Sequence, residues 1–322
     1  MPGAASNLPG LNLSGGAFGQ RVVHEGQAYS FQFVAAPDDL SGHVHSFYIW
    51  RSHRDRLDDV LPAYSGQMAI FVRGSGEMGL ADGPARTGEA FVLSPLQQAR
   101  AFVVSGPALL FGVSLNFRGW AALTGLDVGR CGDRLIDPGQ VLGPEQAARF
   151  AGLPARWQAA EIDEEAMLAE LADILRASLR RLSPRHEQVI ARTYEWLSSA
   201  FNPDIAALYH SLPYSERQAQ RLVTRFFGHP PVRLIRRFRA VRAATLLSMP
   251  TLTPELEAEI REAFYDQAHL IREIRFFTGK TPRLLMPQDG SVVTDMLGPE
   301  GYGAVDLFGG NQDEQLRAAG AI

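Results

Sequence analysis

Arginine and glutamine side chains recur at matching positions in two segments near the C-terminus of this 322-residue chain. At an offset of 51, the segment 215–231 superposes on the segment 266–282. The identical pairs are Arg221 with Arg272, Phe226 with Phe277, Gly228 with Gly279 and Pro231 with Pro282. Each copy has the length of a helix that ends at glycine, and proline suits the first turn of the next helix. Because exposed arginine can bond guanine or phosphate, the repeat predicts a tandem helix-turn-helix reader of DNA.

The charges of the chain are unevenly distributed around a net charge of −4. Residues 217–242 contain eight arginines and no acid, whereas residues 289–322 contain six acids and one arginine. A basic block inside an acidic chain indicates a phosphate-binding surface. The alternative is a solvated helix face whose charge is balanced by acids elsewhere in the fold.

Capping residues mark the helices that must position these side chains. Asn202-Pro203 and Thr253-Pro254 each combine a capping residue with a proline in the first helical turn. The predicted elements are a bracing helix near 187–199, a helix-turn-helix near 203–227, a long connecting helix near 231–248 and a second helix-turn-helix near 254–278. We therefore assign residues 185–287 to an all-α DNA-binding domain.

The segment 21–135 has a different texture, with short apolar runs separated by Gly, Pro and Asp. Runs at that spacing, without the helices that join parallel strands, favour an antiparallel barrel or sandwich. We expect residues 1–20 to be disordered and residues 288–322 to form a flexible acidic tail. The predicted fold class is α+β, with an N-terminal antiparallel β-barrel followed by the all-α domain.

The segment 136–184 is predicted to be a helical linker. Its second helix is expected to span about 163–182, with leucines at spacings of 3, 4 and 7. These leucines are Leu168, Leu171, Leu175 and Leu182. Such a seam either packs on the barrel or pairs with its equivalent in a homodimer, and the sequence leaves both readings open.

Beyond these patterns, the segments YSERQAQRLVTRFFGHPPVRLIRRFRAVRAATLL and FYDQAHLIREIRFFTGKTPRLL resemble the DNA-binding domain of AraC-type transcription regulators. The resemblance covers about 100 residues and implies two helix-turn-helix units joined by one long helix. Each unit would place its second helix in the major groove. The N-terminal part resembles, more weakly, the cupin-type sensory domains of such regulators, through SLNFRGWAAL and GDRLIDPG.

The resemblance also assigns candidate DNA contacts by position. Base contacts are implied for Arg217, Gln220 and Arg221 in the first unit, and for Gln267, His269 and Arg272 in the second. His269 has an alternative role, which is to cap or brace the turn. Phosphate contacts are expected from Ser215, Arg225, Arg236, Arg239 and Arg275, because these polar groups suit backbone contacts that set the register on DNA.

The second unit departs from the family pattern more than the first. Its bracing helix carries acids where the family has an apolar–Ala pair, and Ala263 occupies a turn position in which glycine is usual. The first unit has Tyr209 in place of a small residue and Pro213 in place of glycine. Acids near a groove-facing helix repel phosphate, so we expect the first unit to carry most of the DNA contact and the second to act as a brace.

The residues that could support catalysis or bind metal form no complete set. His43 and His45 have strand spacing, but no glutamate follows at the distance expected for a cupin metal site. The chain also lacks a G-x-S-x-G elbow, a phosphate-binding loop and a dinucleotide fingerprint. We therefore expect no enzyme activity, no metal and no cofactor, and we read Cys131 as a buried apolar residue.

These features predict a sequence-specific, DNA-binding transcription regulator of a bacterium. Its expected partners are double-stranded DNA, RNA polymerase, and a small-molecule or protein effector at the N-terminal domain. The N-terminus has no secretion-signal pattern, and no run of 18 apolar residues suits a membrane span, so we expect a cytoplasmic protein. Two alternatives remain: a protein-interaction regulator with weakened DNA reading, and a metal-dependent cupin enzyme.

Overall fold

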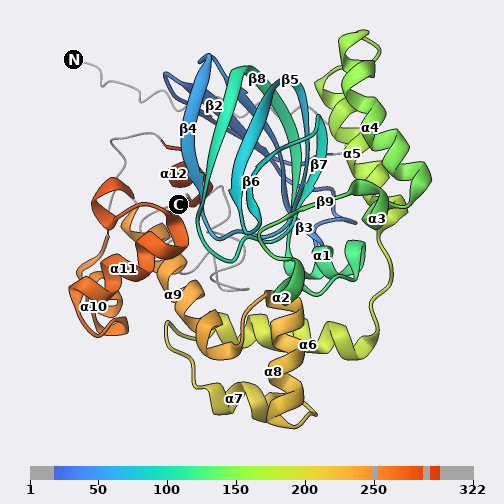
Figure 1. The fold of residues 1–322 in the computed structure, drawn as a ribbon. Coiled ribbons are helices and arrows are strands. Elements are labelled where there is room, and N and C mark those ends of the chain that lie inside the picture. The colour runs from blue at the N-terminus through green and yellow to red at the C-terminus, as the bar shows by residue number, and fades with distance from the viewer. Residues whose placement is uncertain (1–17, 249–251, 286–290, 298–322) are drawn as a thin grey trace, which may run out of the picture.

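A curled antiparallel sheet of nine strands makes up the N-terminal half of the protein (Figure 1). The computed structural model describes residues 18–248, 252–285 and 291–297. The strand order is β1-β2-β3-β8-β5-β7-β9, with β4 beside β8 and β6 beside β5. The strands are β1 Arg21–Glu25, β2 Tyr29–Val34, β3 Val44–Ser52, β4 Arg56–Leu61, β5 Gln67–Leu80, β6 Gly83–Arg86, β7 Ala90–Leu93, β8 Arg100–Leu115 and β9 Leu135–Ile136. The predicted N-terminal antiparallel β-barrel is confirmed, and we call this sheet the barrel.

Strand β8 produces the curl of the sheet. The sequence pattern divides it into two apolar runs, but the strand continues through both of them. Its first half pairs with β4 and its second half with β3, while β5 pairs with both halves on the other side. Strand β8 therefore has three partners, and the sheet curls around an apolar interior.

Alternate side chains of the barrel strands serve two separate cores. On β3, Tyr48 and Trp50 point into the barrel interior, where they join a cluster that continues into the helical domain. Phe47 and Ile49 point outward and pack beneath the helices that cover the sheet. This alternation follows from the two-residue period of a strand. The barrel and the helical domain therefore share one hydrophobic core.

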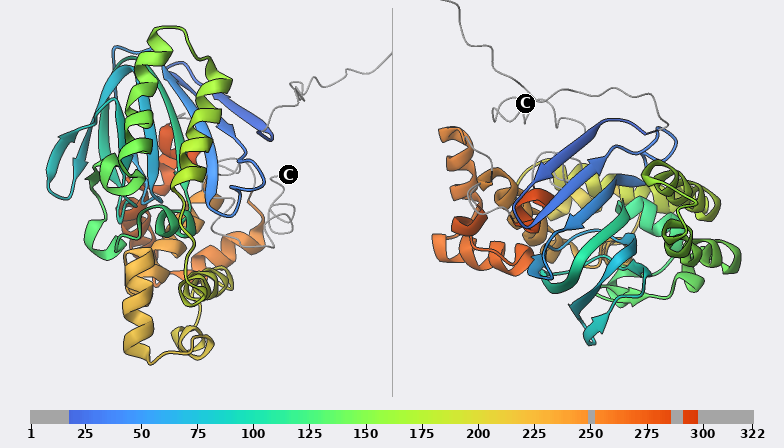
Figure 2. Two further views of the ribbon diagram at one scale, coloured as in Figure 1. Left: turned by 90° about the vertical axis from the view of Figure 1, so that its right-hand side faces the viewer. Right: turned by 90° about the horizontal axis from the view of Figure 1, so that it is seen from above.

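Five helices lie between the two halves of the chain: α1 Phe117–Thr124, α2 Val128–Cys131, α3 Pro138–Leu142, α4 Pro144–Gln158 and α5 Glu164–Ser178. Helices α4 and α5 cover the outer face of the sheet, while α1 and α2 lie at its lower end, next to the helical domain (Figures 1 and 2). Leu168, Leu171 and Leu175 of α5 are completely buried in the outer core of the same chain. The leucine seam thus packs on the barrel, which decides against pairing through this seam. The helix ends at Ser178, before Leu182, so that leucine does not belong to it.

The C-terminal half is helical and lies below the barrel in Figure 1. Its elements are α6 Pro184–Ser198, α7 Ile205–Ser211, α8 Glu216–Phe227, α9 Pro231–Leu247, α10 Pro254–Ala263, α11 Gln267–Thr278 and the 3₁₀ turn η1 Pro282–Leu285. Helices α7 and α8 form one helix-turn-helix unit, α10 and α11 form the other, and α9 joins them. This arrangement confirms the predicted fold class.

The expectations for the two ends of the chain need one correction. Residues 1–17 lie outside the described part of the structure, while Phe18 stacks edge-on against Phe47 at 5.1 Å. Of the tail predicted to be flexible, the structure describes only 291–297. There the chain forms α12, Val292–Leu297, whose apolar side chains are buried. The prediction was wrong for α12, because it weighed the acids of this tail above its short apolar run.

Candidate nucleic-acid interface

Local interactions define both ends of α8, the second helix of the first unit. The hydroxyl of Ser215 accepts a hydrogen bond from the backbone N–H of Gln218, and the Gln218 side chain accepts one from the N–H of Ser215. This capping box satisfies backbone groups that the first turn leaves open. Gly228 ends the helix in the left-handed region, at φ 84°. Ser215, predicted to contact phosphate, is exposed, but its hydroxyl already serves the cap.

Helix α8 has one buried and one exposed face. The buried side chains are Ala219, Val223, Phe226 and Phe227. Arg217, Gln220 and Arg221 are exposed. Within the described part of the chain, none of these three side chains has a hydrogen-bond or ion-pair partner. All three residues of this unit that are predicted to contact bases are therefore exposed to solvent, where their hydrogen-bond donors can reach a binding partner.

Helix α11, the second helix of the second unit, is capped in a similar way. The carboxylate of Asp266 accepts a hydrogen bond of 2.6 Å from the N–H of His269, and Gly279 ends the helix at φ 79°. The buried residues of α11 include Ile274 and Phe277, which match Val223 and Phe226 of α8 at the offset of 51. The sequence repeat is therefore also a structural repeat.

The exposed face of α11 carries Gln267, Arg272 and Arg275. Residues in the described ranges provide no hydrogen-bond or ion-pair partner for these three side chains. Just before the helix, Tyr265 is 93% exposed. Tyr265 is not among the predicted site residues, although an aromatic residue directly before a capping aspartate is visible in the sequence.

His269 and two predicted phosphate contacts meet inside the helical domain at a buried carboxylate. Glu273 of α11 is only 2% exposed. Its oxygens lie 2.6 Å from Nε of Arg236, 2.5 Å from Nη2 of Arg239 and 3.0 Å from Nε2 of His269. A buried carboxylate requires such partners, because burial removes the water that would otherwise stabilise its charge. We call Glu273, Arg236, Arg239 and His269 the Glu273 cluster.

Arg239 extends this cluster to both helix-turn-helix units. Its Nη1 donates to the side-chain oxygen of Asn202 at 2.8 Å and to the carbonyl oxygen of Ala263 at 3.2 Å. The guanidinium also lies over the ring of Phe264, 4.7 Å from its centre. Only 11% of the Arg239 side chain is exposed. We therefore remove Arg239 from the phosphate-binding set and assign it to internal support.

The other members of that set keep more exposure. Arg236 bonds Glu273 with Nε, yet 52% of its side chain is exposed. Arg225 is half-buried, and its Nη2 donates to the carbonyl oxygen of Gly125 at 3.3 Å. His269 is half-buried beside Glu273 and Phe264, the bracing position that the sequence analysis held as its alternative.

Both units contact the barrel through equivalent positions. After Gly228, His229 lies with Nε2 3.1 Å from the carbonyl oxygen of Gln97. After Gly279, Lys280 places Nζ 2.8 Å from Oδ1 of Asp59 on β4. His229 and Lys280 are 51 residues apart, which is the offset of the sequence repeat.

Backbone bonds strengthen the contact of the second unit. The N–H of Ala63 donates to the carbonyl oxygen of Phe277 at 2.6 Å, and the N–H of Ala99 donates to that of Phe276 at 3.1 Å. Because these last carbonyls of α11 have no partner inside the helix, the barrel supplies their hydrogen bonds. The barrel thus holds both recognition helices at their C-terminal ends.

The two docking groups differ in charge. Burial, assisted by the charge of Arg237, lowers the pKa of His229 to about 4. The imidazole is therefore neutral at pH 7, and its Nε2–H donates to Gln97. Lys280 instead forms an ion pair, since Asp59 lies beside it on the barrel.

The bracing helices of the two units differ in charge as well. Helix α10 exposes Glu255, Glu257, Glu259 and Glu262. One of its charges is paired, since Arg261 lies 2.9 Å from Glu257 on the same helix. Helix α7 carries no acid within its bounds. The electrostatic potential is therefore less favourable to phosphate beside α11 than beside α8.

The histidine pair considered for metal binding lies at the barrel. His45 is 9% exposed, with its ring 6.3 Å from the ring of Tyr64, and His43 is half-buried. Among residues 18–248, 252–285 and 291–297, no group of three or more His, Cys, Asp or Glu side chains lies close enough together to hold a metal ion. In the same ranges, every helix is too short or too polar to cross a bilayer.

Comparisons with known proteins give structural likenesses only. No protein-family model and no curated protein matches this chain. ToxT from Vibrio cholerae is 8% identical, with a TM-score of 0.39, over 71% of this chain and 97% of ToxT. A ToxT structure from the O395 strain bound to (E)-4-(8-methylnaphthalen-1-yl)but-3-enoic acid has a TM-score of 0.38, with 8% identity over the same shares. Hydroxypropylphosphonic acid epoxidase from S. wedmorenis is 11% identical, with a TM-score of 0.23, over 29% of this chain and 55% of the epoxidase. This chain is thus similar to ToxT over more than two thirds of its length, and it spans about half the length of the epoxidase.

Proposed function

We propose that this protein is a transcription regulator of AraC type that binds double-stranded DNA, with α8 as its main recognition helix. The observation that carries the proposal is the exposed set Arg217, Gln220 and Arg221, which has no side-chain partner in the described chain. Arginine and glutamine present the paired donors and acceptors that read guanine and adenine in the major groove.

Helix α11 supports a second, weaker contact. Gln267 and Arg272 are exposed for base contact, and Arg275 is exposed for phosphate contact. The four glutamates of α10 lower the local affinity for phosphate, and His269 is engaged with Glu273. We propose phosphate contacts from Arg225, Arg236 and Arg275, with the backbone N–H groups at the start of α8 beside Ser215.

The other parts of the chain fit a regulator that responds to a signal. We propose that the N-terminal domain binds an effector, that RNA polymerase is a protein partner, and that the protein acts in the cytoplasm. The shared core of the barrel and the helical domain supports the effector proposal, because a change in the barrel can reach the recognition helices through packed side chains.

The test is a selection of sites from a random double-stranded DNA library, followed by titration of the selected site at fixed salt. Replacing Arg217 and Arg221 together by alanine should weaken binding at least about 10-fold, since each base contact contributes on the order of 1–3 kcal/mol. Arg86→Ala is the matched control, because Arg86 is an exposed arginine on β6 of the barrel. A library without an enriched sequence would overturn the proposal.

One observation favours a second candidate function, a regulator that binds a protein through its second unit. Ile271 and Phe276 on α11 are 37% and 42% exposed, and Tyr265 lies close by. Exposed aromatic side chains are common at protein interfaces. Under this candidate, the DNA footprint would cover the site of α8 alone, and a Tyr265→Ala variant would keep full DNA affinity.

A further inference from the structure

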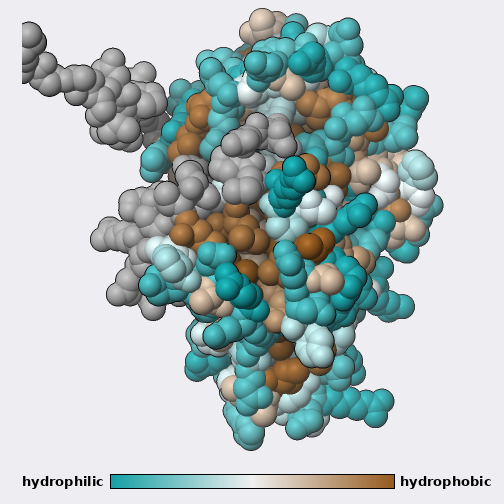
Figure 3. All heavy atoms as spheres, turned by 90° about the vertical axis from the view of Figure 1, so that its left-hand side faces the viewer, coloured by the Kyte–Doolittle hydropathy of each residue, from teal (hydrophilic) through white to brown (hydrophobic). Residues whose placement is uncertain are grey.

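The barrel interior contains an apolar cavity that the DNA-binding proposal does not use. The cavity has a volume of about 90 Å³ and is partly open to solvent. Its walls are mainly aromatic and aliphatic and include Phe31, Tyr48, Trp50, Phe71 and Phe102. Hydrophobic residues also gather at the centre of the surface on the side where Figure 1 places β4 and α12 (Figure 3). An apolar and aromatic lining of this kind is typical of a small-molecule site.

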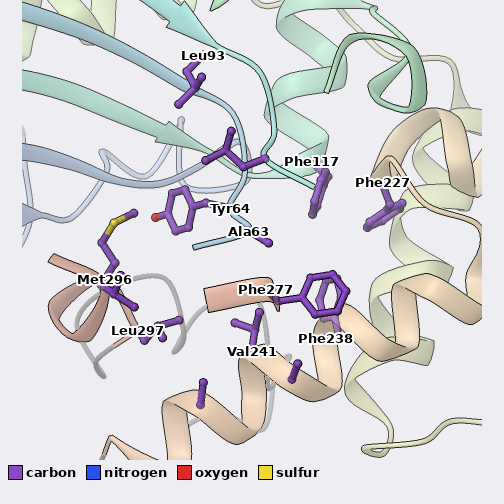
Figure 4. Packing of buried hydrophobic residues seen from close by; sticks show 14 of the residues in the cluster. Ala63, Tyr64, Leu93, Phe117, Phe227, Phe238, Val241, Phe277, Met296 and Leu297 are labelled. Atoms are coloured by element: carbon purple, nitrogen blue, oxygen red, sulfur yellow. The ribbon is translucent and has the colours of Figure 1, made fainter. Parts of the chain in front are cut away.

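Part of the cavity wall comes from outside the barrel. Val292 and Met296 of α12 line the cavity, although α12 follows the second recognition helix in the chain. These residues are four apart, so they lie on the same face of the helix. In Figure 4, Met296 extends from α12 toward the side of Tyr64. The C-terminal part of the protein therefore completes the wall of an N-terminal cavity.

The neighbouring face of α12 belongs to the helical domain. Val293 and Leu297, again four residues apart, are completely buried in the core shared with α9. Figure 4 shows Leu297 on the side of α12 that faces Val241 of α9. The short helix thus contacts the cavity with one pair of side chains and the helix that joins the two recognition units with the other.

Polar contacts tie α12 to the barrel. The hydroxyl of Tyr29 donates to Asp295 at 2.6 Å, and the carboxylate of Asp59 accepts from the N–H of Val292 at 3.0 Å. Asp59 also receives Lys280, the residue that follows the second recognition helix. One carboxylate on β4 therefore holds both the start of α12 and the end of the second helix-turn-helix unit.

The lining defines the chemical class of a ligand. Among the described residues that line the cavity there is no arginine, lysine or histidine, so a carboxylate would enter without a countercharge. The oxygen of Gln67 already accepts a hydrogen bond of 2.6 Å from the hydroxyl of Tyr48. Glu77 also lines the cavity, but its side chain is 50% exposed and lies 4.0 Å from Arg86, so its charge is met outside the cavity. The cavity therefore suits a neutral molecule with an aromatic ring or an alkyl chain.

We propose that the barrel binds a neutral apolar effector against α12, so that ligand and α12 hold each other in place. The side chains of Val292 and Met296 line the space, so a ligand there packs against both of them. When α12 is held in place, it stabilises the position of α9 and of the C-terminal end of α11, which contacts the barrel. This inference rests on the proposed function only for its last step, in which ligand binding changes affinity for DNA.

The first experiment measures binding of prodan, a neutral naphthalene dye, to the full chain without DNA. Met296→Asp should lower prodan affinity by about 10-fold or more, because the variant removes an apolar wall and places a charge beside the ligand. Met296→Leu, a volume-conserving control, should stay within about 2-fold. Equal affinity of the Asp variant and the parent would show that the site lies away from α12. Higher affinity would show that α12 competes with the ligand, and either result overturns the proposal.

A second variant keeps the test decisive if Met296→Asp fails to fold. Asp59→Asn weakens the anchor of α12 and leaves every lining side chain unchanged, so it should also lower prodan affinity. Hydrogen exchange provides an independent measurement: prodan should slow exchange at the amides of α12 and of Ala63, which donates to Phe277. Unchanged exchange at both places would contradict the coupling.

The location and the chemical class of the ligand have their own controls. Energy transfer from tryptophan to bound prodan should fall in Trp50→Phe, since Trp50 lines the cavity. The anionic dye 1-anilinonaphthalene-8-sulfonate should bind at least about 10-fold more weakly than prodan at this site.

A separate titration of the selected DNA with and without prodan tests the last step, in which ligand binding changes the affinity for DNA. A protein that binds prodan as described but no DNA would refute the proposed function and leave the ligand site standing.

Discussion

The two helix-turn-helix units share a backbone design and differ in how they use charge. Both recognition helices end at a left-handed glycine, Gly228 or Gly279, and both contact the barrel through the next residue. The offset of 51 aligns Glu273 with Leu222, which is partly buried in the first unit. At this position the second unit buries a carboxylate, whereas the first unit has an apolar side chain; the apolar packing at Ile274 and Phe277 is common to both.

This difference shows how duplicated elements can diverge without losing their fold. In the second unit, arginines of α9 are drawn to Glu273 and are less available to DNA. In the first unit, Arg217 and Arg221 remain exposed on α8. The arginine-rich segment 217–242 contains no acid in the sequence, but Glu273 lies beside it in the fold. Some of its arginines therefore support the domain from inside, and others remain exposed on the surface.

The largest expected effect comes from the Glu273 cluster. Glu273→Gln should lower the free energy of unfolding by about 3–5 kcal/mol, because it leaves buried arginine without a countercharge. Urea unfolding followed by circular dichroism measures the change. Glu262→Gln on exposed α10 is the matched control and should stay within about 0.5 kcal/mol. A loss no larger than the control's would show that Arg236 and Arg239 are not held by this carboxylate.

The next effect separates the two docking contacts by pH. The pKa of His229 is about 4 in the folded chain, and its ordinary value is 6.5, so below pH 6.5 the unfolded chain binds the additional proton. The His229 contribution to stability is complete above pH 6.5 and is lost as the pH falls toward 4. It amounts to about 3 kcal/mol.

Urea unfolding of parent and His229→Gln between pH 4 and pH 7.5 provides the measurement. The variant should lose less stability over this range, while carboxylate titrations cancel in the difference. Lys280→Gln, the equivalent change in the second unit, should retain the pH dependence of the parent. Parallel curves for parent and His229→Gln would mean that this imidazole is not buried neutral at the barrel.

A smaller effect compares DNA reading by the two units. Arg221→Ala should weaken binding to the selected site by on the order of 1–3 kcal/mol and relax the preference at one base pair. Arg272→Ala should have a clearly smaller effect, because the exposed glutamates of α10 lie in the same unit and repel the DNA phosphates. Titration against single-base variants of the site at fixed salt measures both. An equal loss with a separate base preference would establish two equivalent reading helices.

The smallest effect concerns salt dependence. Arg275→Ala should make the dependence of log K on log salt shallower by about one unit, the change expected for one lost phosphate contact. Arg239→Ala should lower stability and leave that slope unchanged, since Arg239 is engaged inside the domain. If both variants change the slope alike, the division of the arginines into support and surface is incorrect.

Local signals predicted the helices well, because caps act over a few residues. Ser215 and Gly228 determine the ends of α8 through their own backbone and nearest neighbours. The Glu273 cluster was out of reach, since Glu273 and Arg236 are 37 residues apart and meet only through the packing of α9 on α11. The spacing of four between His269 and Glu273 was the one local hint. Helix α12 was also missed: Ser291 caps it by accepting a hydrogen bond from the N–H of Thr294 at 3.4 Å, but six residues are too few for a helical pattern of apolar side chains.

The docking of both recognition helices on the barrel has a consequence for the DNA itself. Gln97, Ala63 and Asp59 belong to one β-scaffold, so the distance and rotation between α8 and α11 are set by the barrel. A DNA site read by both helices must match that rotation to the helical repeat of about 10.5 base pairs. Inserting about five base pairs between the two half-sites would turn one of them to the opposite side of the duplex. Because the barrel fixes the rotation between α8 and α11, the protein would then bind only one of the two half-sites.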